Sequence, residues 1–315
     1  MPLKNDILFE LLNTEDYISG EALAEKFNKS RAAVWKAIKS LQAQGYGIDA
    51  VTNRGYRLTD SKNLVSAQSI RAKMKNRIDV IYCGCVDSTN NMCKRLLADS
   101  KQGMFLVAAN QQTAGRGRQG KSFYSPKGTG IYFSLVLRPK TALQNAVTAT
   151  TAAAVAVCRA IEELTALKPK IKWVNDVYLD GKKVCGILTE AVTNFEEGIV
   201  DSVIVGIGIN ISTDEFPDDV EGAGCLNVSV DRSALVAKIA DELIKIAGGD
   251  YKSFIDYYRS HSLVIGEKIK FIQNGRVSLA TALEIDEAGG LKVQLENGEV
   301  TTLRSGEISI RKIKS

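Results

Sequence analysis

The spacing of apolar residues changes near residue 61 and again near residue 266, and these two changes limit what the chain can fold into. Before the first change, the spacing and the cap residues are those of short helices. Between the two changes, apolar runs of strand length alternate with helical segments. After the second change only short strands separated by Gly-Gly and Asn-Gly turns are predicted. We therefore predict an α+β multidomain chain with domains at residues 1–62, 63–264 and 265–315.

The composition fits a folded chain of this kind. Of 315 residues, 45% are hydrophobic and 24% are charged, which is near the average for globular proteins and excludes disorder and collagen. No apolar run reaches the roughly 18 residues of a membrane-spanning helix, and we expect neither secretion nor membrane insertion. The six cysteines include no CxxC pair, and Cys83 and Cys85 alternate onto one face of an apolar run. We predict reduced core cysteines and a cytoplasmic location.

The first 60 residues predict a winged helix-turn-helix. Ser19 and Ser30 are placed to cap a second and a third helix. The apolar stripes of the first and third helices are Ile7, Leu8, Leu11, Leu12, Val34, Ile38 and Leu41. Beyond them, runs at 47–51 and 56–58 flank the turn-prone triplet 53–55, which predicts a hairpin, or wing.

The charge distribution in this domain favours DNA as its ligand. The net charge of +5 is too small to indicate nucleic acid, but residues 29–44 carry four basic and no acidic side chains. In this motif the third helix enters the major groove, and basic wing residues reach the backbone or the minor groove. A solvated amphipathic helix in a small helical domain is the alternative. The predicted DNA contacts are Lys29, Ser30, Arg31, Trp35, Lys36, Lys39, Arg54 and Arg57.

The remaining chain predicts a mixed-sheet α+β domain followed by an SH3-like β-barrel. Strands are predicted in the central domain at 80–86, 105–109, 131–137, 171–179, 184–188 and 202–211, and in the barrel at 267–273, 277–285, 291–295 and 300–303. Helices are predicted around Met92, Cys93, Leu96 and Leu97, and at 147–164 and 235–247.

Residues 115–120, Gly-Arg-Gly-Arg-Gln-Gly, match the GxGxxG pattern of dinucleotide-binding folds. That pattern must open a helix, whereas residues 123–130 are aromatic, contain Pro and Gly, and precede another strand. We therefore predict a flexible loop that closes over an anion, with Arg116 and Arg118 pairing with phosphate oxygens. A mobile surface loop with incidental arginines is the alternative.

The pair Asp180-Gly181 predicts a two-residue hairpin turn. Counting outward from it, the predicted strand pairs are Leu179 with Lys182, Tyr178 with Lys183, and Asp176 with Cys185. Asp176 and Lys183 then project from the same face as diagonal neighbours, so that a carboxylate and an amine converge. A surface pair that serves solubility is the alternative, against which the surrounding apolar residues argue. By the same parity, Asn175 points to the opposite face unless a bulge intervenes.

Ser88, Thr89 and Asn90 lie between a predicted strand and a helix start. Helix capping explains one of them, but together with Gln112 they supply donors and acceptors for a neutral, amide-like ligand group. His261 is the only histidine and has no partner at ligand or triad spacing, so the sequence predicts neither histidine-dependent catalysis nor a His-built zinc site.

Five strings together resemble the biotin–protein ligases: DSTNN (87–91), QTAGRGRQG (112–120), YSP (124–126), KWVNDVYLDGKKVCGIL (172–188) and GIGIN (206–210). With the N-terminal winged helix, the chain is similar to bifunctional members that also repress biotin-operon transcription. The sequence departs from the family pattern at Val174, where proline is usual, and at Phe123, where tryptophan is common.

The resemblance implies a biotin/lipoate ligase fold for the central domain and the activity of a biotin–[acetyl-CoA-carboxylase] ligase. Family members activate the carboxylate of biotin on the α-phosphate of ATP, release pyrophosphate, and pass biotin from biotinyl-5′-AMP to a lysine. The implied partners are the biotin carboxyl carrier domain of a biotin-dependent carboxylase, operator DNA, and a second copy of the chain when the adenylate is bound. Biotin and ATP are substrates, and Mg²⁺ is the implied metal.

The resemblance also implies roles for single residues. Arg118, Lys183 and Asp176 are expected to be catalytic, through charge stabilisation and positioning, and Asp176 could hold magnesium or the incoming amine. The expected biotin contacts are Ser88, Thr89, Asn90, Gln112, Gly115, Arg116, Gly117, Arg118, Lys183 and Gly186. The expected ATP contacts are Arg116, Arg118, Asn175, Asp176, Lys183 and Asn210.

Two other functions remain open at this point. A lipoate- or octanoate-transferring enzyme shares the fold, but it reads an aliphatic chain and does not need the Ser-Thr-Asn cluster. A ligand-sensing repressor without catalysis needs the winged helix, but it has no reason to keep Arg118, Asp176 and Lys183 together.

Overall fold

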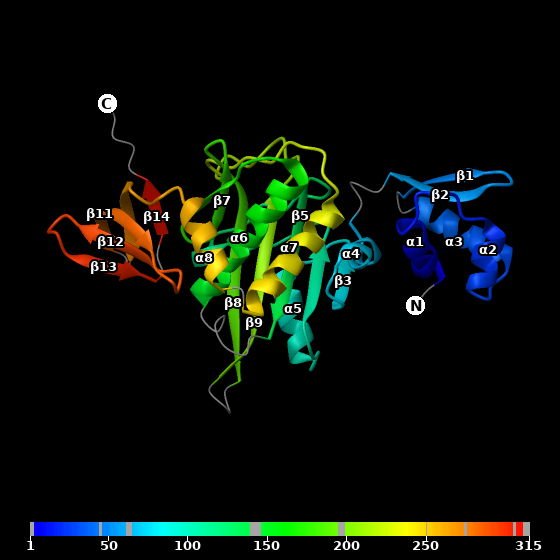
Figure 1. Cartoon of the computed structure of the whole chain (residues 1–315), viewed down its shortest axis with the longest axis horizontal. Coiled ribbons are helices and arrows are strands. Elements are labelled where there is room, and N and C mark those ends of the chain that lie inside the picture. Colours follow the sequence, from blue (N-terminus) through cyan, green and yellow to red (C-terminus); the bar gives the residue numbers. More distant parts are fainter. Residues whose placement is uncertain are drawn as a thin grey trace.

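The fold is described from a computed structural model that covers residues 3–43, 46–60, 65–138, 146–194, 199–249, 251–273, 276–304 and 307–310. The helical N-terminal part and the C-terminal sheet lie at opposite ends of a larger central domain (Figure 1). The predicted boundary at 62/63 falls among residues 61–64, which lie outside the described residues. The predicted domain limits stay a prediction.

The N-terminal part is a winged helix-turn-helix, as the sequence predicts. It consists of α1 (Leu3–Leu12), α2 (Gly20–Lys26), α3 (Arg31–Ala43), β1 (Gly47–Val51) and β2 (Gly55–Asp60). Ser19 Oγ accepts a hydrogen bond from Ala22 N, and Ser30 Oγ accepts one from Ala33 N, so both serines cap the helices that follow them. The strands β1 and β2 pair antiparallel as the wing. The apolar stripes of the helices meet in a small core of their own.

A seven-stranded mixed sheet forms the centre of the molecule, with strand order β3-β4-β5-β9-β8-β7-β6. Its strands are β3 (Asp79–Cys83), β4 (Phe105–Ala109), β5 (Gly130–Leu137), β6 (Lys170–Lys172), β7 (Asp176–Leu179), β8 (Lys182–Asn194) and β9 (Ile199–Asn210). Only β3 and β4 are parallel neighbours among these strands.

Helices pack on both faces of this sheet. On one face, α6 (Ala146–Thr165), α7 (Arg232–Ala247) and α8 (Tyr251–Ser260) bury the main apolar core. On the other face, α5 (Thr89–Ala98) packs on a smaller cluster. Alternate side chains of β4 point into the two opposite layers: Phe105 and Val107 face α5, whereas Leu106 and Ala108 face the main core.

Before the C-terminal sheet, three elements differ from the predicted pattern. The predicted single strand at 171–179 is wrong, because residues 173–175 form a turn between β6 and β7, which pair with each other. The helices α4 (Ala67–Lys73) and α8 were not expected. Helix α4 is only seven residues long and has few apolar residues, whereas α8 does carry apolar residues at helical spacing, Phe254, Ile255 and Tyr258, so its pattern was present in the sequence and was missed.

The C-terminal sheet is antiparallel, with order β13-β12-β11-β10-β14. Its strands are β10 (Lys268–Gln273), β11 (Arg276–Ile285), β12 (Leu291–Leu295), β13 (Val300–Leu303) and β14 (Glu307–Ile310), of which β14 was not predicted. No pair between β13 and β14 closes this sheet within the described part of the chain, so the SH3-like barrel stays a prediction. Its buried residues continue the main core of the central domain, and Trp173 Nε1 donates to the carbonyl of Gly289 at 2.9 Å.

The cysteines are only partly as expected. All six thiols are free, and Cys93, Cys158 and Cys185 are buried. The prediction of a core position is wrong for Cys85, which is exposed because β3 ends at Cys83, two residues before it. Cys83 and Cys225 are only half-buried. Among the described residues, no helix is long and apolar enough to cross a membrane.

Candidate functional site

A cavity of about 170 Å³ opens on the α5 face of the central sheet. The start of α5, the loop between β4 and β5, and the strands β8 and β9 supply most of its walls. Of the predicted ligand contacts, the following line it: Ser88, Thr89, Asn90, Gln112, Arg116, Gly117, Arg118, Asn175, Asp176, Lys183 and Gly186. The fold therefore brings residues of four of the five quoted strings, all except YSP (124–126), to one cavity, together with nearly all of the predicted contacts.

Gly115 and Asn210 are the two predicted contacts that do not line the cavity. A Cβ atom at Gly115 would lie 2.4 Å from the carbonyl oxygen of Phe123, so this glycine lets two parts of the loop approach each other. Asn210 is buried at the end of β9, where its Nδ2 donates to the Gly224 carbonyl at 2.9 Å.

Two glycines of β9 form part of the cavity floor. A Cβ atom at Gly206 would lie 2.2 Å from Asn90 Oδ1, and one at Gly208 would lie 2.3 Å from a ring carbon of Phe123. Both glycines are therefore required for these two side chains to lie against the sheet. The Phe123 ring also contacts Tyr132 edge to face, with centroids 6.4 Å apart. Gly206, Gly208 and Phe123 lay within or beside the quoted strings, but no ligand role was predicted for them.

Polar side chains gather at the α5 end of the cavity. Gln112 Oε1 accepts from the backbone N and the hydroxyl of Thr89, at 2.8 and 3.1 Å. Gln112 Nε2 donates to Ser125 Oγ at 2.9 Å, which fixes the amide. Ser88 is the N-cap residue of α5 but makes no side-chain cap hydrogen bond, so its hydroxyl is not committed to the helix.

A carboxylate and an amine meet at the other end of the cavity. Lys183 Nζ lies 2.7 Å from Asp176 Oδ1, which places these two groups together as the hairpin predicts. The predicted pairs Leu179 with Lys182 and Tyr178 with Lys183 are confirmed, but that of Asp176 with Cys185 is wrong. A bulge between Val177 and Tyr178 shifts the register, so that Asp176 pairs with Gly186. At the bulge, the backbone of Lys183 bonds to Gly222 and Gly224 instead.

Asn175 lies on the cavity side, contrary to the parity argument. It belongs to the turn between β6 and β7 and not to a strand, so strand alternation does not apply to it. Its Nδ2 donates to the Ile187 carbonyl at 3.1 Å, and its Oδ1 accepts from Arg118 Nη1 at 3.2 Å. Asn175 and Arg118 therefore face the same end of the cavity as Asp176.

The glycine-arginine loop opens no α-helix, as predicted. Its only helical turn is a 3-10 turn at Arg118–Gly120, and the loop folds back so that Phe123 N donates to the Gly115 carbonyl at 2.9 Å. The two arginines diverge: Arg118 reaches Asn175, whereas Arg116 Nη2 contacts Glu190 Oε2 at 3.0 Å.

Further side chains in the cavity were not predicted. Lys172 and Trp173 come from the KWVND string, Ile187 and Leu188 from β8, and Ile308 from β14. Ile308 shows that the C-terminal sheet takes part in the site. No sequence signal marked it, because β14 itself was not recognised.

Three family models match the chain. The biotin/lipoate A/B protein ligase family matches residues 82–210, an HTH domain matches 4–57, and the biotin protein ligase C-terminal domain matches 264–311. The bifunctional ligase/repressor BirA of Bacillus spizizenii is 33% identical over 98% of both chains. The chain belongs to the biotin protein ligase family. The BirA protein of Escherichia coli is 28% identical to this ligase, over 99% of this chain and 97% of the other.

A solved structure agrees with this assignment. The biotin protein ligase of Aquifex aeolicus in complex with biotin and ATP matches with a TM-score of 0.63 and 32% identity. The match covers 75% of this ligase and 99% of the other chain. The fold of the catalytic part is therefore that of the biotin protein ligases.

The predicted DNA contacts of the ligase lie on the surface of the winged helix-turn-helix. All of them are exposed except Arg57, which is half-buried. Trp35 is 52% exposed although it is a large aromatic residue, and Lys39 Nζ lies 5.9 Å from its ring centroid. The polar face of α3 and the wing are thus accessible to a partner.

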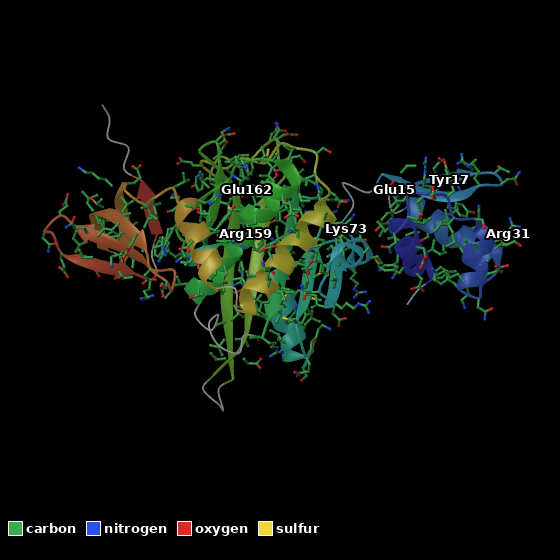
Figure 2. All side chains as sticks on the ribbon, in the orientation of Figure 1. Glu15, Tyr17, Arg31, Lys73, Arg159 and Glu162 are labelled. Carbon is green, nitrogen blue, oxygen red and sulfur yellow. The ribbon has the colours of Figure 1, made fainter. Side chains whose placement is uncertain are left out.

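Tyr17 belongs to this surface and was not predicted. It lies beside the wing (Figure 2), and the guanidinium groups of Arg54 and Arg57 each lie 4.6 Å from its ring centroid. Its hydroxyl donates to Asp49, and this hydrogen bond is the main reason that the pKa of Tyr17 is raised above its ordinary value. The Tyr17 ring thus contacts the guanidinium groups of both basic wing residues. The spacing of these residues in the sequence does not indicate this contact.

Proposed function

We propose that this chain is an ATP-dependent biotin protein ligase that forms biotinyl-5′-AMP and passes biotin to a lysine of a carrier domain. The observation that carries the proposal is one cavity, which joins an end lined by the polar side chains Ser88, Thr89 and Gln112 to an end with Arg118, Asn175, Asp176 and Lys183. Biotin is a bicyclic urea with an acid side chain, and ATP carries a triphosphate. The two substrates therefore need a polar region for the urea next to a charged region for the carboxylate and the phosphates.

The polar end suits the ureido ring of biotin. The uncommitted hydroxyl of Ser88 and the backbone and side chains around Gln112 offer donors and acceptors to a neutral amide. The glycines at 206 and 208 let the Asn90 amide and the Phe123 ring lie against the sheet beside this end.

The charged end suits the reacting groups. Attack of the biotin carboxylate on the α-phosphate of ATP brings negative charges together, and Arg118 and Lys183 would neutralise them as pyrophosphate leaves. Asp176 holds the Lys183 amine at 2.7 Å, which fixes its position before substrate arrives. In the second step the carrier lysine attacks the acyl carbon of biotinyl-AMP, and AMP leaves.

Asp176 is the residue that we propose for magnesium. Magnesium usually takes one or two carboxylates and completes its shell with phosphates and water. The described residues hold no group of three or more His, Cys, Asp or Glu side chains arranged for a metal, which fits an ion that arrives with ATP. When bound there, the ion would neutralise phosphate charge.

We propose that the winged helix-turn-helix makes the ligase a biotin-responsive repressor that binds operator DNA as a homodimer when biotinyl-AMP is bound. The exposed basic face of α3 and the wing support DNA as the partner. The full-length similarity to proteins called bifunctional ligase/repressor supports the combination of both activities. The free thiols support a cytoplasmic location.

Incubation with biotin, ATP and magnesium, followed by mass spectrometry, tests the ligase activity. We expect bound biotinyl-AMP, and transfer of biotin to an added carrier domain. Parallel incubations with lipoate and octanoate separate the ligase from the lipoate-type enzyme. Absence of any adenylate would refute the ligase proposal and would favour the ligand-sensing repressor.

A further inference from the structure

Glu190 lies on β8, two residues beyond Leu188, and does not itself line the cavity. It stands where three parts of the molecule meet: the strand, one face of α5, and the glycine-arginine loop. Asn90 and Lys94 of α5 are four residues apart and therefore present their side chains to it from the same helical face.

The carboxylate of Glu190 receives hydrogen bonds from all of these side chains. Lys94 Nζ donates to Oε1 at 2.7 Å, and Asn90 Nδ2 donates to Oε2 at 2.8 Å. Arg116 Nη2 contacts both oxygens, at 3.3 and 3.0 Å. Of these partners, Asn90 and Arg116 line the cavity, whereas Lys94 does not.

The Asn90 amide is fully oriented by this arrangement. Its Nδ2 also donates to the Leu188 carbonyl at 3.2 Å, and its Oδ1 accepts from Ser134 Oγ at 2.6 Å. The amide therefore has one defined orientation against Gly206, with no donor to spare. Without Glu190, the Nδ2 group would keep only its longer hydrogen bond.

The electrostatics of the cluster hold Arg116 in place as well. Burial by itself would raise the pKa of Glu190, but hydrogen bonds from Lys94 and Asn90 and the charges of Lys94 and Arg116 outweigh it and lower that pKa. Glu190 is thus ionised at neutral pH and attracts Arg116 to the α5 end of the cavity. Arg118 is held at the opposite end by Asn175.

We propose that Glu190 is a positioning residue for biotin: it fixes the Asn90 amide under the ligand and, through Arg116, holds the glycine-arginine loop over it. This inference rests on the proposed ligase function, and it divides the two loop arginines between the two substrates. Arg116 serves the biotin end, and Arg118 serves the nucleotide end.

The test is Glu190→Gln, which keeps the size of the side chain but removes its charge and one of its acceptors. We expect a roughly 3- to 10-fold rise in the KM for biotin and in the release rate of biotinyl-AMP, the range for partly exposed charge-assisted hydrogen bonds. The KM for ATP should change less than about 2-fold, because the inference assigns the nucleotide to the Arg118 end of the cavity. Arg116→Ala should raise the same two quantities, and the double variant should show less than the product of both effects.

Glu284→Gln is the matched control, because Glu284 also pairs with a lysine at 2.7 Å but lies in the C-terminal sheet away from the cavity. It should leave all of these constants unchanged. Thermal unfolding of each variant shows whether the fold is retained. An unchanged biotin KM and release rate in Glu190→Gln, or an equal rise for biotin and ATP, would overturn the inference. Wild-type protein that forms no biotinyl-AMP would overturn the proposed function, and the inference with it.

Discussion

The Lys183→Ala variant tests the charged end of the cavity most directly. Lys183 Nζ is held 2.7 Å from Asp176, and the two side chains are 32% and 20% exposed, so the amine is fixed but still reachable by a ligand. Removal of one charge-assisted contact to the reacting carboxylate or phosphate costs about 1.5 to 3 kcal/mol, or about 10- to 150-fold in the step that uses it.

The same change should affect folding much less. The ion pair with Asp176 is partly exposed, so its loss should cost below about 1 kcal/mol of stability. The assay is single-turnover formation of biotinyl-AMP, measured together with urea unfolding. Lys292→Ala, which breaks the lysine pair with Glu284 in the C-terminal sheet, is the control and should leave adenylation unchanged. If Lys183→Ala adenylates biotin at the normal rate, the amine is a solubilising surface group and the proposed site geometry is wrong.

Three further predictions concern other parts of the molecule. Deletion of residues 1–60 should leave biotinylation largely intact but abolish operator binding, because this part has its own core. Tyr17→Leu should weaken operator binding by about 3- to 10-fold at fixed salt through loss of the wing arginine contacts, and Tyr17→Phe should do so less. Burial raises the pKa of Tyr132 to about 12. The contribution of its neutral hydroxyl to folding stability is therefore complete below pH 10 and is lost as the pH rises toward 12. Tyr132→Phe should therefore reduce the alkaline loss of stability by up to about 2 to 3 kcal/mol.

Each of these predictions has an outcome that contradicts it. Loss of ligase activity on deletion would mean that the winged helix-turn-helix supports the catalytic core. Equal operator affinity for Tyr17→Leu and wild type, measured by titration, would mean that the wing arginines need no support. Identical urea unfolding curves for Tyr132→Phe and wild type between pH 9.5 and 11.5 would remove Tyr132 as a source of the alkaline transition.

Local signals explain what the sequence could predict. The caps at Ser19 and Ser30 and the turn at Asp180-Gly181 depend on near neighbours, so the helices and the hairpin follow from them. The bulge beside Tyr178 could not be predicted from near neighbours, because it arises where the Lys183 backbone bonds to the distant residues 222–224.

Long-range packing explains what the sequence could not predict in the site. Asn175 was misplaced because the turn that carries it interrupts an apolar run that resembles one strand. Ile308 and Glu190 come to the cavity or to its edge only through the order of strands in two sheets. Nothing in the spacing of the chain specifies that order. Local patterns marked the loop arginines, the pair Asp176 and Lys183, and the polar group at 88–90. The resemblance added the ligand roles of Gly117, Asn175 and Gly186, because it carries long-range information that periodicity lacks.

The arrangement of the two cores bears on how the ligand controls DNA binding. The central domain and the C-terminal sheet share one continuous core, to which Trp173 and Ile308 tie the cavity. The winged helix-turn-helix has a separate core, so binding of the adenylate in the cavity does not repack the DNA-binding helices directly. A single small domain with few phosphate-binding cations binds DNA weakly, whereas two copies held together on one operator gain effective concentration. We therefore expect biotinyl-AMP to raise operator affinity by joining two chains, and sedimentation and DNA titration should show both changes at the same ligand concentration.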